Sequence, residues 1–359
     1  MARDVPGDST AAVRPALSIC VPTYNRPLLV ERTIRSIVEA ASSVADQVEI
    51  IVSDNSPDVS ESTCREALGA WPGRSLYVAN RPNIGLTANF NQCIERASGR
   101  YVLFVQDDDR LLPGSVPAVL EVLRADAPGE VLLFGIDLVD EHGRLIRRQA
   151  FCRDHRVDGR QALHRLLSDN GLAWFPGLVL RRDAVEEVGR FDGAFANAMD
   201  FEMFVRLFAR FGVRCLPTAI SAYTVHGESA TQLMGFDAED VGRLIAVFER
   251  AKATGVLPDS TIRRCEADYL HQFILGAASV RVRQGDATGA REILSLFDLP
   301  AIRSLETSRV WRTLRAITGL LVRLPVALVR PLMTLVDRLD LARRVRAAQY
   351  RGRDGIQVC

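Results

Sequence analysis

The sequence is poor in lysine and in long apolar runs. Lys252 is the single lysine among 45 basic residues in a chain of 359. The most apolar stretch is Thr313–Val336, and its longest charge-free run, Ala316–Val322, falls far short of the roughly 20 residues that a spanning helix needs. The segment Met1–Arg14 lacks the apolar core of a signal peptide. We therefore expect no transmembrane helix and a cytoplasmic protein.

Paired cysteine motifs are missing as well. The seven cysteines are scattered, odd in number and never spaced as Cys-x-x-Cys. This pattern argues against a zinc site and a disulfide framework, and it fits a reducing compartment. The cysteines are Cys20, Cys64, Cys93, Cys152, Cys215, Cys265 and Cys359.

Neither low complexity nor a strong overall charge is present. The hydrophobic share of 48% and the charged share of 25% are ordinary for a globular protein and exclude disorder. The net charge of +1 conceals an asymmetry, because residues 301–359 carry 12 arginines against 4 acidic residues. A basic C-terminal segment makes an anionic surface its natural partner.

From residue 17 to residue 137, apolar runs of strand length alternate with amphipathic stretches. This rhythm is typical of βαβ units on a mainly parallel sheet. The expected strands are Leu17–Pro22, Val48–Ser53, Ser75–Ala79, Tyr101–Val105 and Glu130–Ile136. The expected helices are Pro27–Ala41, Ser60–Ala70, Leu86–Ala97 and Pro113–Arg124, with proline at the first position of two of them.

After residue 137 the rhythm changes. We expect a hairpin or loop over Val139–Arg148, a helix over Gly159–Leu167, a strand over Trp174–Arg181, a helix over Ala198–Phe211, and strands over Val213–Leu216 and Ala219–Val225. Helical patterns dominate from Phe236 onward. The predicted organisation is a polar tail (1–16), an α/β domain (17–235) and a helical extension (236–359) that is basic from residue 301.

Polar residues follow the first two expected strands. Val21–Arg26 ends the first strand, and Asp54–Ser56 ends the second. In an open α/β sheet the carboxyl ends of the strands form the ligand crevice, where a carboxylate such as Asp54 can accept from a base or a ribose. A helix cap or loop turn is an equal alternative for these residues. A nicotinamide-dependent oxidoreductase is disfavoured because no Gly-x-Gly-x-x-Gly motif follows the first strand.

Three adjacent carboxylates, Asp107–Asp109, follow the strand Tyr101–Val105. Their mutual repulsion makes a divalent cation the favoured explanation, and hard oxygen ligands suit Mg²⁺ or Mn²⁺ bridging to substrate phosphates. A solvated acidic loop is the alternative. Farther along, Asp200 and Glu202 diverge on the surface of one helix, so we expect only one of them to face the crevice.

The motifs together resemble the family 2 glycosyltransferases, which have the GT-A fold. The resemblance runs from about Leu17 to Thr231 and rests on the order and spacing of five segments. These are SICVPTYNRP, IIVSDNS, RPNIGLTANFNQCI, ASGRYVLFVQDDDRLLPG, and MDFEMFVRL followed by YTVHGESAT. The resemblance implies an inverting enzyme that moves a sugar from a nucleotide diphosphate sugar to an acceptor hydroxyl, with Mn²⁺ or Mg²⁺ as cofactor.

The resemblance also implies residue roles. Asp200 is the expected general base. Pro22, Thr23, Asn25, Arg26, Asp54, Asn83, Gly85, Asn91, Asp107 and Asp108 are the expected nucleotide-binding residues. Asp107, Asp109 and His226 are the expected metal or diphosphate ligands. Trp174, Phe175, Gly177 and Glu202 are expected on the acceptor side.

Two points stay open. Gln106 stands where many family members begin the acidic motif with Asp, so either Asp108 or Asp109 could be the metal ligand. The alternative to an enzyme is a GT-A-like protein that binds a nucleotide sugar or a partner without turnover.

We expect the acceptor to be a saccharide or lipid-linked saccharide of the cell envelope, and no nucleic-acid partner. Arginines 312, 315, 323, 330 and 338 would form a stripe on a helix. This stripe predicts peripheral contact of residues 301–359 with an anionic membrane, at the inner face of the plasma membrane. Packing on the catalytic domain is the alternative.

Overall fold

The computed structural model describes residues 14–57, 61–169, 171–225, 237–324 and 356. Its strands are β1 (Leu17–Thr23), β2 (Val48–Asp54), β3 (Arg74–Ala79), β4 (Tyr101–Phe104), β5 (Arg110–Leu111), β6 (Val131–Asp140), β7 (Leu145–Gln149), β8 (His155–Val157), β9 (Leu178–Arg181) and β10 (Val213–Val225). Its main helices up to residue 225 are α1 (Pro27–Ala41), α2 (Glu61–Gly69), α3 (Leu86–Arg96), α4 (Ser115–Leu123), α5 (Gly159–Ser168), α6 (Arg182–Val188) and α7 (Met199–Phe211).

These strands form one mixed sheet in the order β3-β2-β1-β4-β9-β6-β10-β5, with β7 beside β6 and β8 beside β10. The first four strands in this order are mutually parallel. β9 runs antiparallel to both β4 and β6, and β10 is parallel to β6. The predicted mainly parallel mixed sheet is confirmed.

Helices cover both faces of the sheet because side chains alternate along each strand. On β1, Leu17, Ile19 and Val21 pack into a core under α1, α2 and α4. Cys20 points to the opposite core, which contains residues of α3, α5 and α7. The parallel strands therefore end together at one edge, with a helix following each.

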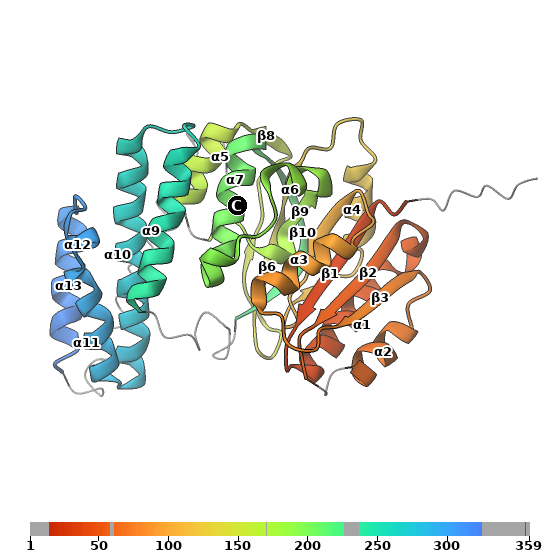
Figure 1. The fold of residues 1–359 in the computed structure, drawn as a ribbon, viewed down its shortest axis with the longest axis horizontal. Helices are drawn as coiled ribbons and strands as arrows, with labels where there is room; N and C mark the ends of the chain where they lie inside the picture. The colour runs from red at the N-terminus through yellow and green to blue at the C-terminus, as the bar shows by residue number, and fades with distance from the viewer. Residues whose placement is uncertain (1–13, 58–60, 170, 226–236, 325–355, 357–359) are drawn as a thin grey trace, which may run out of the picture.

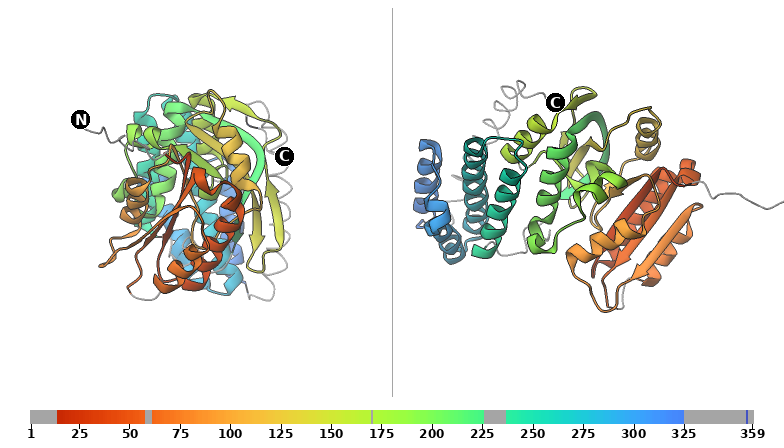
Figure 2. Two further views of the ribbon diagram at one scale, coloured as in Figure 1. Left: turned by 90° about the vertical axis from the view of Figure 1, so that its right-hand side faces the viewer. Right: turned by 45° about the horizontal axis from the view of Figure 1, so that its top comes forward.

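Helices α9 (Ala238–Ala253), α10 (Asp259–Gln284), α11 (Ala287–Ser295), α12 (Pro300–Arg303) and α13 (Arg309–Leu321) form a block beside the sheet (Figure 1). Figure 2 shows the same block from two further directions. It shares a continuous core with the α/β part, in which Phe201 of α7 stacks on Tyr269 of α10 at 5.0 Å. Asp237 caps α9, and its side chain accepts from the backbone N–H groups of Glu239 and Asp240. Among the described helices, none is long and apolar enough to cross a membrane.

Most predicted elements lie within two residues of the observed ones, and α1 starts at Pro27 as predicted. Pro113 does not start a helix, because Gly114 takes a φ of 74° and α4 begins at Ser115. The strand predicted over Trp174–Arg181 is wrong in its first half, where Phe175–Gly177 forms a 3₁₀ turn before β9. The two strands predicted after Val213 are one strand, β10, with register shifts between Leu216 and Ser221.

The cysteine prediction needs one correction. Five cysteines are free and buried, namely Cys20, Cys64, Cys93, Cys215 and Cys265. Cys152 is disulfide-bonded, which the scattered spacing of the cysteines did not predict. Its partner is not among the described residues.

Gly177 is a position where the fold leaves no room for a side chain. A Cβ there would lie 2.8 Å from Ile136 Cγ2 and 3.1 Å from the Phe134 carbonyl oxygen. We expect Gly177→Ala to lower the free energy of unfolding by about 1–3 kcal/mol through overpacking. Gly276→Ala is the matched control, because nothing lies within 4 Å of its Cβ position in α10, and alanine there should stabilise by about 0.5–1 kcal/mol. Equal urea denaturation midpoints for the two variants would contradict this packing.

Candidate active site

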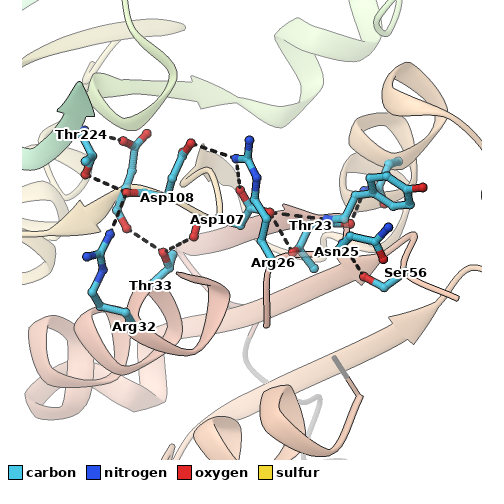
Figure 3. A network of polar contacts seen from close by, with 12 residues as sticks. Thr23, Asn25, Arg26, Arg32, Thr33, Ser56, Asp107, Asp108 and Thr224 are labelled. Atoms are coloured by element: carbon cyan, nitrogen blue, oxygen red, sulfur yellow. Dashed lines mark hydrogen bonds and ion pairs between the residues drawn. The ribbon is translucent and has the colours of Figure 1, made fainter. Parts of the chain in front are cut away.

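The polar ends of β1 and β4 meet in one hydrogen-bonded cluster (Figure 3). Thr23 Oγ1 donates to Asp107 Oδ2 at 2.9 Å, and the Tyr24 N–H donates to the same oxygen at 3.4 Å. β1 and β4 are paired neighbours, so their C-terminal residues lie at the same edge of the sheet. The sequence prediction that Thr23 and Asp107 belong to one crevice agrees with this contact.

Arg26 is the counter-charge of the acidic loop. Its Nη1 donates to Asp107 Oδ1 at 3.1 Å and to Asp108 Oδ2 at 2.9 Å. Burial, together with the charge of Asp108, raises the pKa of Asp107 to about 6. The positive charge of Arg26 therefore offsets only part of the unfavourable electrostatics of Asp107 and Asp108.

Asp109 differs from its two neighbours because it is fully buried. Its Oδ1 accepts the Thr224 N–H at 3.0 Å, and its Oδ2 has no partner among the described residues. Burial and the charge of Asp108 raise its pKa well above the usual range. Asp109 is one of the predicted metal ligands, and its carboxylate lies buried with one oxygen bonded to the backbone of Thr224.

Two threonines hold the backbone of the acidic loop. Thr33 of α1 directs its hydroxyl to the Asp107 and Asp109 carbonyls at 3.0 and 2.7 Å. Thr224 Oγ1 donates to the Asp108 carbonyl at 2.7 Å from β10. Neither threonine was singled out from the sequence, because each is distant along the chain from the loop it supports.

A second polar cluster surrounds Asp54 at the end of β2. Asp54 is 1% exposed, and its two oxygens accept from the Ser56 N–H at 2.8 Å and the Tyr77 hydroxyl at 2.7 Å. Ser56 Oγ in turn accepts the Asn25 N–H at 2.8 Å. Asn25 has a φ of 54°, a left-handed conformation that asparagine tolerates better than most residues. The predicted residues Asn25 and Asp54 are thus joined through Ser56.

Asn80 is the centre of a buried network that the sequence did not reveal. Its Nδ2 lies 3.0 Å from Ser53 Oγ, 3.0 Å from Asn55 Oδ1 and 3.1 Å from Asn89 Oδ1. Asn89 Nδ2 reaches the Thr23 carbonyl at 3.3 Å. These amides connect the ends of β1, β2 and β3 with α3.

The remaining predicted nucleotide-binding residues are Asn83, Gly85, Pro22 and Asn91. Asn83 Oδ1 accepts the Gly85 N–H at 2.8 Å, and Gly85 has a φ of 87° at the start of α3. Pro22 is buried within β1. Asn91 exchanges two hydrogen bonds with the backbone of Phe191, at 2.9 and 3.0 Å. Asn91 therefore ties α3 to the segment before α7, and its predicted nucleotide contact is not supported.

Asp200 lies in the first turn of α7 and is partly buried. Burial raises its pKa. Burial, together with the charges of Asp109, Asp108 and Asp200, raises the pKa of Tyr223 on β10. The ring centroid of Tyr223 lies 4.5 Å from that of Trp174.

Three acceptor-side predictions need correction. Glu202 is fully buried, and its oxygens pair with Arg206 at 2.7 Å, so Asp200 and Glu202 diverge as expected. Phe175 packs in an aromatic cluster with Phe90, Phe104, Phe191 and Phe204. Gly177 is enclosed by β6. Trp174, which is only partly buried, remains beside the site.

The structure describes only some of the predicted metal ligands. His226 lies outside the described residues. Within the described ranges, no three His, Cys, Asp or Glu side chains converge on one position. A cation at the acidic loop would therefore depend on one or two carboxylates together with oxygens from a ligand.

Comparison with known proteins decides the family. Residues 18–189 match the model of glycosyl transferase family 2. The uncharacterized protein MT1568 of Mycobacterium tuberculosis is 30% identical over 231 residues, covering 60% of this chain and 71% of that protein. This chain belongs to glycosyltransferase family 2. It is a glycosyltransferase enzyme.

Two relatives of this glycosyltransferase carry names from cell-envelope glycan synthesis. The GalNAc(5)-diNAcBac-PP-undecaprenol beta-1,3-glucosyltransferase of Campylobacter jejuni is 35% identical over 133 residues, 36% of this chain and 41% of that protein. The abequosyltransferase RfbV of Salmonella typhimurium is 25% identical over 206 residues, 53% of this chain and 60% of that protein. The chain thus spans less than two thirds of these two relatives.

Solved structures agree on the GT-A fold. S. aureus TarS 1-349 in complex with UDP-GlcNAc has a TM-score of 0.60 at 16% identity, covering 84% of this chain and 87% of that one. The mannosyltransferase PcManGT from Pyrobaculum calidifontis, in complex with GDP-Man and Mn²⁺, has a TM-score of 0.52 at 19% identity, covering 86% and 85%. At these identities the similarity shows the fold alone.

Proposed function

We propose that this glycosyltransferase moves a sugar from a nucleotide diphosphate sugar to an acceptor hydroxyl, with inversion at the anomeric carbon. The observation that carries the proposal is the polar cluster at the ends of β1 and β4, where Thr23 and Arg26 hydrogen-bond to the acidic loop in a chain that matches the family 2 model. We also propose that residues 17–235 form the catalytic part and residues 236–359 a helical extension.

The donor proposal rests on the cluster around Asp54. A base or ribose bound there would meet the carboxylate of Asp54 and the backbone of Asn25, at the edge where β1 and β2 end. The structure of TarS holds UDP-GlcNAc and that of PcManGT holds GDP-Man, which supports a nucleotide sugar as donor. Asn83 and Gly85 would shape the loop beneath it.

The acidic loop fits a divalent cation held partly by the substrate. Asp107 and Asp108 carry hard oxygen donors, and a single guanidinium, that of Arg26, contacts both carboxylates. Mg²⁺ and Mn²⁺ sites of this kind use one or two carboxylates plus phosphate oxygens. We assign the metal contact to Asp108 and Asp107, since Asp109 is fully buried. When bound, the cation would neutralise charge on the departing diphosphate.

Asp200 is the proposed general base. It would accept the proton of the acceptor hydroxyl while the acceptor oxygen bonds to the anomeric carbon and the bond from that carbon to the diphosphate oxygen breaks. A carboxylate whose pKa is raised by burial holds a proton more readily near neutral pH, which favours this role. The ion pair between Glu202 and Arg206 fixes the turn of α7 that carries Asp200.

The proposed acceptor is a saccharide or lipid-linked saccharide of the cell envelope. The Campylobacter relative is named for an undecaprenol-linked substrate, and a Bacillus subtilis relative is named as a minor teichoic acid biosynthesis protein. Trp174 and Tyr223 offer an aromatic pair beside Asp200 on which a sugar ring could stack.

Peripheral membrane contact through α13 is part of the proposal. One side of α13 packs inward through Thr318 and Leu321, while Ile317 and Leu320 are 41% and 61% exposed on another side. Arg312 and Arg323 are exposed beside them, whereas Arg315 lies over the ring of Phe297 at 4.6 Å. Apolar side chains flanked by arginines suit an anionic lipid surface. Arg330 and Arg338 lie outside the described residues.

A thermal-shift panel of UDP, GDP, dTDP and NAD, each with and without Mn²⁺, tests the donor site. We expect one nucleoside diphosphate to stabilise the protein only with Mn²⁺, by about 2.7 kcal/mol at 100 times its Kd. Asp108→Asn should abolish the Mn²⁺-dependent stabilisation. Asp126→Asn, which changes an exposed carboxylate after α4, should keep this stabilisation. A flat panel on folded protein would favour the alternative of a GT-A-like protein without donor binding.

Asp200→Asn tests the base. Its amide cannot accept the acceptor proton, so we expect turnover to fall roughly 10²–10⁴-fold while calorimetry shows nucleotide affinity within twofold of the wild type. Asp183→Asn is the control, because it changes an exposed carboxylate in the first turn of α6 and should keep turnover. Full turnover by the Asp200 variant, or loss of its nucleotide binding, would refute the assignment.

Vesicle sedimentation tests α13. We expect binding to anionic vesicles and weak binding to neutral ones, and a fall of more than tenfold for Ile317→Ser/Leu320→Ser, since each buried side chain contributes about 1.5–3 kcal/mol. Leu145→Ser/Ile146→Ser on β7 removes two residues that are 59% and 58% exposed, and it should change nothing. An equal loss of vesicle binding in the two double variants would mean that α13 has no specific role in membrane contact.

A further inference from the structure

A cavity of about 370 Å³ lies between α1 and β5, on residues that the proposed reaction does not use. Three arginines line it, namely Arg32 and Arg35 of α1 and Arg110 of β5. Its volume falls within the range of small-molecule pockets, about 300–1,000 Å³. The charges of these arginines decide what the cavity can bind.

Arg35 is neutralised within the fold, because its Nη2 lies 2.8 Å from Glu31 Oε1 one turn earlier. Arg32 and Arg110 have no ion pair in the described part of the chain. The closest contact of Arg32 is a long one, from Nη2 to the Asp108 carbonyl at 3.5 Å. The Nε atoms of both Arg32 and Arg110 are buried and have no hydrogen-bond partner among the described residues.

The two guanidinium groups also act on each other. Burial and the charge of Arg110 lower the pKa of Arg32, while the charges of Asp108 and Asp109 act in the opposite direction, so the repulsion between the two guanidinium groups is only partly compensated. The remaining acid of the lining, Glu39, is exposed and lies two turns along α1 from Arg32. Arginine cannot lose its proton at ordinary pH, so only an anion can relieve this arrangement.

We propose that the cavity binds a phosphate or diphosphate group between Arg32 and Arg110. Guanidinium groups match phosphate oxygens in charge and in planar, two-pronged geometry. This site is separate from the proposed donor site and does not depend on the transfer reaction.

The site is coupled to the acidic loop through the chain itself. Arg110 directly follows Asp109, and Arg32 contacts the Asp108 carbonyl from below the loop (Figure 3). An anion that draws Arg32 and Arg110 together would hold both ends of this short segment. An anion bound between Arg32 and Arg110 would therefore rigidify the loop that carries Asp107 and Asp108.

Inorganic diphosphate, titrated into the full chain in EDTA, tests the site by calorimetry and thermal shift. We expect saturable binding by the wild type and affinity at least tenfold weaker for Arg32→Gln and for Arg110→Gln. Arg35→Gln lines the same cavity but removes an arginine that is already paired, and Arg26→Gln removes the arginine of the donor site. Both controls should bind within twofold of the wild type. Equal affinity in all five proteins would overturn the proposal.

Stability gives a second readout that a purely structural arginine would not show. In buffer free of multivalent anions, Arg32→Gln and Arg110→Gln should melt at or above the wild-type temperature, because the repulsion is relieved. With diphosphate present, the wild type should melt above both variants. Variants that melt below the wild type by the same margin in both buffers would show a structural role and refute the site.

The phosphate group could belong to a free anion or to a lipid headgroup. Leu28, 79% exposed at the edge of the cavity, offers an apolar contact for a lipid chain. Geranyl diphosphate that binds at least tenfold tighter than inorganic diphosphate, with the excess removed by Leu28→Ser, would assign a lipid-linked ligand. Equal affinities would assign a free phosphate or diphosphate to the same arginines.

Discussion

The structure depends most on how the negative charge at the end of β4 is contained. Three consecutive carboxylates lie where the sheet ends, and two of them are almost completely buried. The guanidinium of Arg26 and hydroxyl and amide donors from β1, α1 and β10 hydrogen-bond to this loop and stabilise it. Because the donors come from three elements, the loop is rigid only when those elements are assembled. The same residual negative charge is the reason for proposing a divalent cation at this loop.

Packing on one face of the sheet is dominated by aromatic side chains. Phe90, Phe104, Phe175 and Phe191 form a cluster that fills the space between α3, β4 and the segment leading to α7. The ion pair between Glu202 and Arg206 links two successive turns of α7. The helix that carries Asp200 is therefore held in place by a hydrophobic core and a buried ion pair.

Local signals in the sequence predicted the elements well and predicted long-range partners poorly. Pro27 fixes the start of α1, and alternating apolar runs fix the strands, because these effects act over a few residues. The positions of Thr23, Arg26 and Asp107 at one edge follow from parallel pairing alone. Asn80, Thr224 and Tyr223 were missed, since their roles come from partners that are far away in the chain or on other elements. Phe175, Gly177 and Glu202 were misplaced for the same reason, as burial decides whether a motif residue faces ligand or core.

Arginine shows this limit most clearly. The basic residues are almost all arginine, so residue type carries no information about which of them acts. The ion-pair partners of each arginine distinguish one arginine from another. Arg26 spans two carboxylates, Arg206 pairs with Glu202, and Arg35 pairs with Glu31, so each contributes charge that the fold already uses. Arg32 and Arg110 differ from these arginines because neither makes an ion pair among the described residues and the buried Nε atom of each has no hydrogen-bond partner there. Charge left uncompensated at a cavity is a stronger indication of a ligand than charge alone, and it directs attention to the far side of the acidic loop.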